Sequence, residues 1–321
     1  MLARRTLLAS APLLAAASSK LLAAVPGKAT WTRLVDAAPF PPSYNFPVHI
    51  DAMGRFVALH PKGTWVSRDG KVWEKSPLPF SGMNSAYLPY VLHNGETWAL
   101  GGLEGNYLSF RVDPVIQLTQ NHARWETKGR SASLPRVVFH AAASFRNRLW
   151  ILGGFDGRHH SAEVWSSPDG LAWSRVATAP WSPRAGSRAI VFRERLFLIG
   201  GGIIDGANAN DVWSTADGVG WQRETGRIAP EEPVGFTPVV HDDAVWLVGA
   251  NRSGRFRSEM LVSADGRVWT PERAPWSPRG GVAAWSAGGA LYVTGGKYSY
   301  ETGGETRFVY SNDVWRMTRG A

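Results

Sequence analysis

The sequence of 321 residues contains no cysteine. Disulfides, thiolate metal sites and a cysteine nucleophile are therefore excluded. The body of the chain also lacks the apolar stripe, with a period near 3.6 residues, that marks an amphipathic helix. The 8 histidines show no spacing typical of a metal site, and no glycine-rich loop leads from a strand into a helix. We therefore predict no bound metal and no cofactor.

Glycine, proline and tryptophan are abundant instead. The chain holds 35 glycines, 21 prolines and 16 tryptophans, and 44% of its residues are hydrophobic. Short strand-like runs separated by glycine and proline turns are typical of an all-β fold. The apolar fraction is large enough for a packed core, so we predict an all-β protein.

The first 24 residues resemble an export signal. Arg4 and Arg5 precede an apolar stretch from Leu7 to Ala17, and small residues suited to cleavage follow it. The pattern resembles a twin-arginine signal, with an ordinary secretory signal as the alternative. The segment is too short and too weakly apolar for a membrane span. We expect residues 1–24 to be removed and residues 25–321 to form one domain, periplasmic or secreted, with no membrane span.

The chain is basic, with a formal net charge of +9. A basic surface can bind nucleic acid. Here the arginines are scattered along the sequence, and an exported protein does not meet nucleic acid. We therefore expect no nucleic-acid partner, and we expect a monomer.

Internal repeats organise the sequence. The string APWSPR occurs at residues 179–184 and again at residues 274–279. Six tryptophans share a related period, with spacings of 42, 52, 48, 48 and 48 residues: Trp31, Trp73, Trp125, Trp173, Trp221 and Trp269. A repeat of this length indicates a solenoid, a propeller or an array of similar units.

Each unit reads as four strands. Four tryptophans of the series follow an Asp-Gly pair, beginning with Asp69-Gly70, and this pair is a strong signal for a hairpin turn. Upstream, runs such as Leu149–Gly154 and Leu196–Gly201 end in Gly-Gly and predict a second hairpin. The strand between residue 102 and Trp125 has no such turn and is not assigned. We therefore predict a four-stranded meander in each unit.

The Gly-Gly pair, the aromatic residue of the next strand and the Pro-Arg dipeptide resemble the kelch repeat over residues 29–321. The resemblance implies a six-bladed β-propeller of four-stranded antiparallel blades, similar to the central propeller of galactose oxidase. Residues 29–34 match the fourth strand of other units, so we expect them to complete the last blade. The copper site of galactose oxidase needs a cysteine, so that activity is not expected here.

The first site candidates are arginines that open the innermost strands. Arg136, Arg184 and Arg279 each follow a proline at equivalent positions, so we expect them to converge at one mouth of the propeller. Clustered guanidinium groups bind carboxylates well. The alternatives are that these arginines only bond loop carbonyls, and that the loop tryptophans only pack. The other ligand-binding candidates are Arg188, Trp181, Trp276 and Tyr298. Nearby loops add further polar candidates: Asp156, His160, Asp205, Asn208, Arg255, Lys297 and Tyr300.

These residues predict a recognition module for an anionic carbohydrate or a protein partner. The first alternative is an enzyme acting on a carboxylated sugar, such as an epimerase, a mutarotase or a lyase. Bacterial kelch propellers that interconvert sialic-acid anomers are similar in architecture, although no local motif here identifies them. The acid/base candidates for such an enzyme are Glu231, Glu232, His140, His159 and Glu301. The second alternative is a structural scaffold for protein interactions.

Overall fold

The computed structural model describes residues 29–76, 89–106, 109–119, 125–252 and 254–320. Every regular element in these ranges is a β-strand. The described residues therefore include no helix that could cross a membrane. The prediction of an all-β fold is confirmed.

Five sheets have four antiparallel strands each, in an order that follows the chain. The first comprises β2 (Val48–Ile50), β3 (Phe56–His60), β4 (Gly63–Ser67) and β5 (Glu74–Lys75). The second comprises β6 (Tyr90–His93), β7 (Glu96–Asn106), β8 (Ser109–Thr119) and β9 (Glu126–Arg130). The third comprises β10 (Ala141–Phe145), β11 (Arg148–Phe155), β12 (His160–Ser167) and β13 (Ser174–Thr178). The fourth comprises β14 (Arg188–Phe192), β15 (Arg195–Ile199), β16 (Val212–Thr215) and β17 (Trp221–Thr225). The fifth comprises β19 (Thr237–His241), β20 (Ala244–Val248), β23 (Glu259–Ser263) and β24 (Thr270–Arg273).

The sixth large sheet joins the two ends of the described chain. It comprises β25 (Gly280–Ala287), β26 (Ala290–Thr302), β28 (Val314–Arg319) and β1 (Ala29–Val35), with β27 (Glu305–Tyr310) paired to the far end of β26. β1 pairs with β28 in antiparallel register, from Ala29 opposite Arg319 to Arg33 opposite Trp315. The N-terminal strand therefore lies where the repeat predicted it. A small sheet of β18 (Pro233–Val234), β21 (Ala250–Arg252) and β22 (Arg255–Arg257) accompanies the fifth large sheet.

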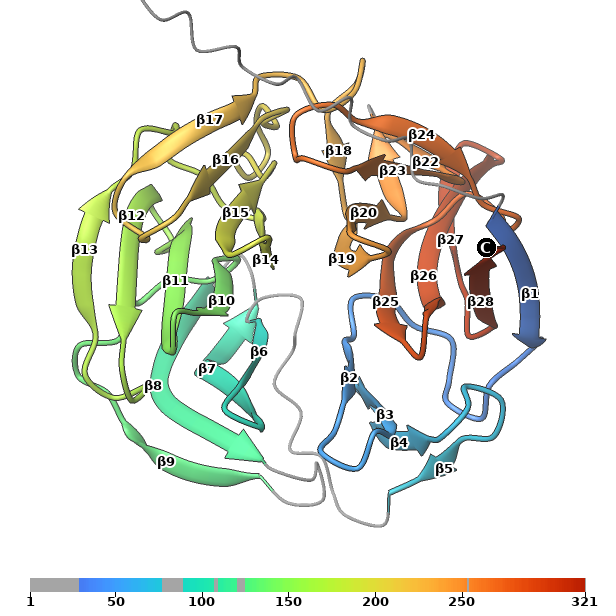
Figure 1. The fold of residues 1–321 in the computed structure, drawn as a ribbon, viewed down its shortest axis with the longest axis horizontal. Helices are drawn as coiled ribbons and strands as arrows, with labels where there is room; N and C mark the ends of the chain where they lie inside the picture. The colour runs from blue at the N-terminus through green and yellow to red at the C-terminus, as the bar shows by residue number, and fades with distance from the viewer. Residues whose placement is uncertain (1–28, 77–88, 107–108, 120–124, 253, 321) are drawn as a thin grey trace, which may run out of the picture.

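The large sheets are arranged around a common centre, with β2, β6, β10, β14, β19 and β25 innermost (Figure 1). Hydrophobic clusters fill the spaces between neighbouring sheets. Phe56 of the first sheet packs on Tyr292 of the last, with ring centroids 4.9 Å apart. This arrangement is that of a propeller.

The Asp-Gly pairs form hairpins through a longer loop than a two-residue turn. At the first pair, Gly70 has a positive φ of 78° and Asp69 does not, so the turn is not of the type with two left-handed residues. The Asp69 carboxylate instead accepts hydrogen bonds from the amides of Lys71 and Val72, at 2.8 and 3.1 Å. The Trp73 indole donates to the Gly70 carbonyl at 3.0 Å, which fixes the tryptophan that follows. The same bonds recur at Asp169, Asp217 and Asp265.

These turns also lock neighbouring sheets together. Each turn glycine lies against an aromatic ring on the second strand of the preceding sheet, where a side chain would collide or crowd. The pairs are Gly170 with Trp98, Gly218 with Trp150, Gly266 with Phe197 and, between the first and last sheets, Gly70 with Tyr292. The repeated Asp-Gly therefore serves both the turn and the contact between sheets.

Candidate ligand-binding site at the inner ends of the sheets

Two adjoining cavities lie where the sheets meet. The smaller, of about 270 Å³, is lined by residues of all six innermost strands. The larger, of about 430 Å³, opens between the β15–β16 loop and the segments around Asn45 and Gly235. Asn45, Pro89, His140 and Arg188 line both cavities. Because six separate sheets supply the wall, this is a place where side chains far apart in the sequence meet.

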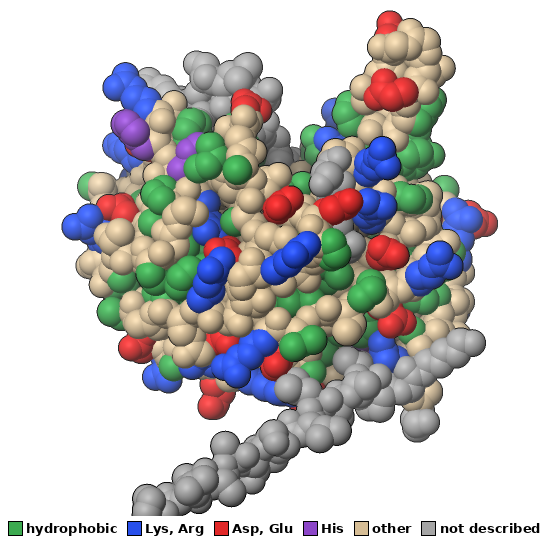
Figure 2. Space-filling view, turned by 90° about the horizontal axis from the view of Figure 1, so that it is seen from above, with side chains coloured by type: hydrophobic (Ala, Val, Ile, Leu, Met, Phe, Trp, Pro, Cys, Tyr) green, Lys and Arg blue, Asp and Glu red, His purple; other side chains and the backbone are tan. Residues whose placement is uncertain are grey.

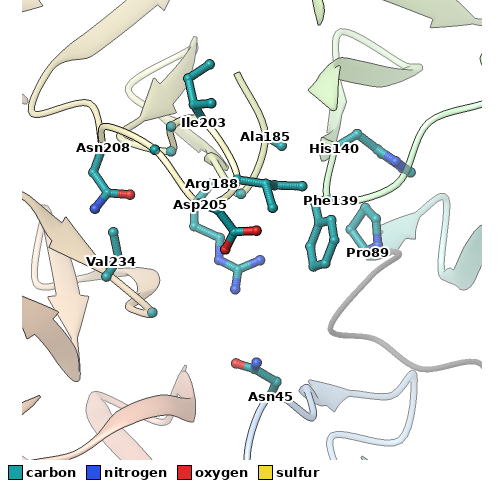
Figure 3. A pocket seen from close by; sticks show the side chains of 16 residues that line it. Asn45, Pro89, Phe139, His140, Ala185, Arg188, Ile203, Asp205, Asn208 and Val234 are labelled. Atoms are coloured by element: carbon teal, nitrogen blue, oxygen red, sulfur yellow. The ribbon is translucent and has the colours of Figure 1, made fainter. Parts of the chain in front are cut away.

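Arg188 is the charged residue that the two cavities share. It lies at the start of β14, and Figure 3 shows its guanidinium extending into the space that Asn45 faces from the other side. Its Nε donates to the Phe236 carbonyl at 3.3 Å. Among the described residues, no carboxylate oxygen lies within 4.0 Å of it, and burial lowers the pKa of the guanidinium. Arginine stays charged in proteins, so this position favours an anion as partner.

Unusual backbone conformations gather at the same cavity. Among the described non-glycine residues with positive φ, seven occupy the turns between first and second strands. The other three, Asn45, Phe139 and Asp205, all line the larger cavity. Asparagine and aspartate tolerate left-handed backbone, but it is costly for a bulky residue such as Phe139. Strain of this kind clusters at ligand sites, so it marks the cavity independently of its charge.

Arg184 and Arg279 do not reach an open mouth, contrary to the predicted convergence. The Arg184 side chain is 3% exposed and forms a two-point ion pair with Asp211, with nitrogen–oxygen distances of 2.5 and 3.2 Å. Arg279 pairs with Asp313 in the same way, at 2.5 and 3.0 Å. Each also donates to a glycine carbonyl at the end of the second strand. The arginine of each APWSPR string therefore links two strands of its own sheet.

The two loop tryptophans of the repeated string are buried as well. Trp181 is 3% exposed and lies edge-on to Trp221, with ring centroids 4.5 Å apart. Trp276 is 4% exposed and meets Trp31 in the same geometry at 4.5 Å. Both rings pack between the loop and an outer strand, so the packing alternative describes them and leaves no face for a ligand.

The remaining candidates lie apart from the cavity walls. Arg136 is exposed, and Tyr298 is half-buried on β26. Glu231 pairs with Arg257 at 2.7 Å, and the half-buried Glu232 follows it. The other two are exposed: Glu301 accepts a hydrogen bond from Thr306, and His159 lies 3.6 Å from Asp156. Of the predicted site residues, four line the cavities: Arg188, His140, Asp205 and Asn208.

Asn45 is a polar lining residue that the sequence did not predict. It lies between the closing strand of the last sheet and the first innermost strand, where no repeat position predicts a role. Its backbone amide donates a hydrogen bond to the Gly281 carbonyl at 2.7 Å, which fixes this segment against the sixth sheet. Only the tertiary structure brings its side chain opposite Arg188 (Figure 3).

His140 has a structural role at the cavity wall. In Figure 3 its ring turns away from the space that Arg188 enters. Nδ1 lies 3.2 Å from the Val137 carbonyl and therefore carries the proton, and Nε2 is buried with no partner among the described residues. Burial lowers the pKa of His140 to about 4. The ring is thus neutral and unsuited to bind an anion.

This histidine should make stability depend on pH. In the unfolded chain its pKa returns to about 6.5, so the unfolded state takes up a proton before the folded state does. The contribution of the neutral His140 to the free energy of unfolding is on the order of 2–3 kcal/mol. It is fully present above pH ~6.5 and is lost as the pH falls to about 4. We expect His140→Gln to flatten the fall in the free energy of unfolding over this range, measured in urea. His159→Gln, at a side chain 81% exposed, is the control and should leave the slope unchanged.

The fold and the repeated sheets define the class of protein, an all-β propeller. No protein-family model matches the chain, and no curated protein sequence does. Among solved structures, the chain is similar to the β-propeller-like protein described as "Structure of YjhT". The TM-score is 0.68 at 14% sequence identity, and the match covers 89% of this chain and 97% of that one. At this identity the similarity concerns the fold alone.

Proposed function

We propose that the protein is an exported six-bladed propeller of the kelch type that binds a carboxylated sugar in the cavity around Arg188. The observation that carries the proposal is the half-buried Arg188, whose guanidinium has no acidic partner among the described residues and extends into a cavity lined by six strands. A carboxylate would supply the missing charge through bidentate hydrogen bonds. The six innermost strands and the repeat at residues 29–321 support the blade number, and the leader of residues 1–24 supports export.

The other lining groups suit the rest of a sugar. Asn45, Asp205 and Asn208 offer amide and carboxylate groups for hydroxyls. The larger cavity, at about 430 Å³, is of the usual size for small-molecule sites. One arginine, with a single carboxylate at Asp205 and neutral amides around it, favours a sugar with one negative charge over a polyphosphate.

Arg188→Gln should abolish most of this affinity. The substitution keeps a polar side chain of similar length but removes the charge, so we expect Kd to rise by about 10–100-fold. The measurement is calorimetric titration of the mature protein with uronic acids and sialic acid, compared with neutral sugars. Arg136→Gln is the matched control on an exposed arginine and should change Kd less than about twofold.

The outcomes separate the possible sites and functions. Binding that survives Arg188→Gln but fails with Arg136→Gln would move the site to the rim and contradict the proposal. An absence of binding across the panel, checked by a thermal shift at about 100 times any plausible Kd, would favour a protein partner.

An enzyme acting on a carboxylated sugar is the second candidate, favoured by one observation. Asp205 is an exposed carboxylate with a left-handed backbone, φ 57°, in the same cavity as Arg188. In such an enzyme the arginine would hold the substrate carboxylate and Asp205 would move a proton at the ring. We expect Asp205→Asn to abolish turnover while Kd changes little. Asp156→Asn, at an exposed carboxylate that lines neither cavity, is the control and should leave turnover unchanged. Turnover unaffected by Asp205→Asn would remove this residue as the catalytic group.

A further inference from the structure

The sixth sheet carries a hairpin that extends beyond its four-stranded part. β26 runs for 13 residues, and its far half pairs with β27 to form a hairpin beyond the four-stranded part. Residues 300–308 are exposed without interruption. The hairpin stands out from the body of the molecule (Figure 2). Like the cavity-lining β15–β16 loop, it follows the second strand of its sheet, so both lie on the same side of the propeller.

The register of the hairpin divides its aromatic residues between two faces. Phe308 is opposite Ser299 and Tyr310 is opposite Lys297, so these four side chains share one face, called here the inner face. Tyr300 is opposite Arg307 on the other face. Phe308 and Tyr310 are 49% and 40% exposed, and Tyr300 is 48% exposed. The inner face thus offers two exposed rings and the other face one, and Tyr300 and Phe308 are equally exposed in different surroundings.

The inner face is continuous with the wall of the cavity. Tyr44 lies 5.6 Å from Tyr310 between ring centroids, and the Lys297 ammonium lies 4.2 Å from the Tyr44 ring and 4.9 Å from the Phe308 ring. Tyr44 is followed directly by Asn45, which lines both cavities. Ser43 bridges to Ser311 and accepts a hydrogen bond from the Gly296 amide at 2.9 Å, so the segment is fixed to the base of the hairpin. A path of aromatic rings, the half-buried Tyr44 and then the exposed Tyr310 and Phe308, therefore leads from the cavity out along the hairpin.

We propose that the ligand is the acidic end of an oligosaccharide, whose following sugar units lie on the inner face of the hairpin. This rests on the proposed function of the Arg188 cavity. The positively polarised C–H groups on the flat side of a sugar ring stack on the negative face of an aromatic ring. The Lys297 ammonium, held between two rings, places a hydrogen-bond donor beside the same path. A lone acidic monosaccharide would fill the cavity and leave this path unused.

The test compares each acid alone with a trisaccharide that ends in it: galacturonic acid with trigalacturonic acid, and sialic acid with sialyllactose. We expect the trisaccharide that fits to bind about five- to tenfold more tightly than its acid, the contribution of one or two stacked rings. Phe308→Ala should remove that gain and leave the Kd of the monosaccharide unchanged. Tyr300→Ala, at an equally exposed ring on the opposite face, should keep the gain.

The outcomes distinguish this inference from the proposed function. If the monosaccharides bind through Arg188 but the trisaccharides bind no more tightly, the inference is wrong and the proposed function stands. If Tyr300→Ala removes the gain as fully as Phe308→Ala, the inner face is not the binding face and the inference is again wrong. If neither acids nor trisaccharides bind, the proposed function fails and this inference fails with it. Melting temperatures of both variants check that the hairpin folds, and Phe308→Leu provides a second variant that keeps an apolar side chain without a ring.

Discussion

Asp211→Ala is expected to lower the free energy of unfolding at pH 7 by about 3–5 kcal/mol, the cost of leaving a buried charge without its partner. The Arg184 guanidinium is 3% exposed, and Asp211 supplies both of its charged contacts. The same carboxylate also accepts a hydrogen bond from the Trp213 indole at 2.9 Å, so its removal leaves a second donor unsatisfied. Urea denaturation of wild type and variant would measure the loss.

The protein offers a matched control for this pair. Arg193 and Asp243 form a similar two-point contact, at 2.5 and 3.0 Å, but their side chains are 49% and 74% exposed. Water solvates either charge when the other is removed, and asparagine tolerates the left-handed backbone at this position, φ 51°, so Asp243→Asn should cost less than about 1 kcal/mol. Equal losses in the free energy of unfolding at the two sites would contradict the assignment of Arg184 as a buried residue that links two strands.

Replacing both Arg184 and Asp211 provides a second test of this structural role. The double variant Arg184→Met with Asp211→Leu removes the unpaired charge and fills the site with apolar groups. We expect it to be more stable than Asp211→Ala alone, because the main cost of the single change is the uncompensated charge. A double variant as unstable as the sum of the two single changes would indicate independent roles.

The architecture was predictable because each unit repeats its local signals. Asn94-Gly95 and Gly288-Gly289 turn between the first and second strands with positive φ at both residues, as such dipeptides do. The second sheet was the exception, since no Asp-Gly pair follows its third strand, β8, which pairs with β7 through a longer hairpin. Repetition therefore predicts the strands, and departures from it limit the prediction.

The site was less predictable because a repeated arginine can serve the fold or a ligand. A signal for the fold was present: Asp211 and Asp313 both stand in an Asn-Asp-Val-Trp string, in the two units whose arginine is buried. In the third sheet Glu163 occupies the position of that aspartate, where it pairs with Arg175, and Arg136 is exposed. Arg188 is not part of this pattern, and its lack of an acidic partner among the described residues is visible only in the structure.

Gly218→Ala is expected to destabilise the protein by about 2–5 kcal/mol, from crowding and from backbone strain together. A Cβ atom at this position would lie 1.9 Å from Cη2 of Trp150, far inside van der Waals contact. The ring cannot easily retreat, because Trp150 is 3% exposed and its indole donates to the Phe145 carbonyl at 2.8 Å. The added methyl group must therefore separate the third and fourth sheets or displace the tryptophan.

Gly95→Ala separates the two contributions. Gly95 has a φ of 79°, close to the 84° of Gly218, but a Cβ there would meet no atom within 4 Å. Its substitution carries only the strain of a left-handed alanine, about 1–2 kcal/mol. The difference between the two variants, measured by urea denaturation, therefore reports the collision between sheets. Trp150→Leu in the Gly218→Ala background should recover part of the loss, because residues in contact have non-additive effects. If Gly218→Ala were no worse than Gly95→Ala, the turn glycines would serve the turns alone, and the tight contact between neighbouring sheets would not contribute to stability.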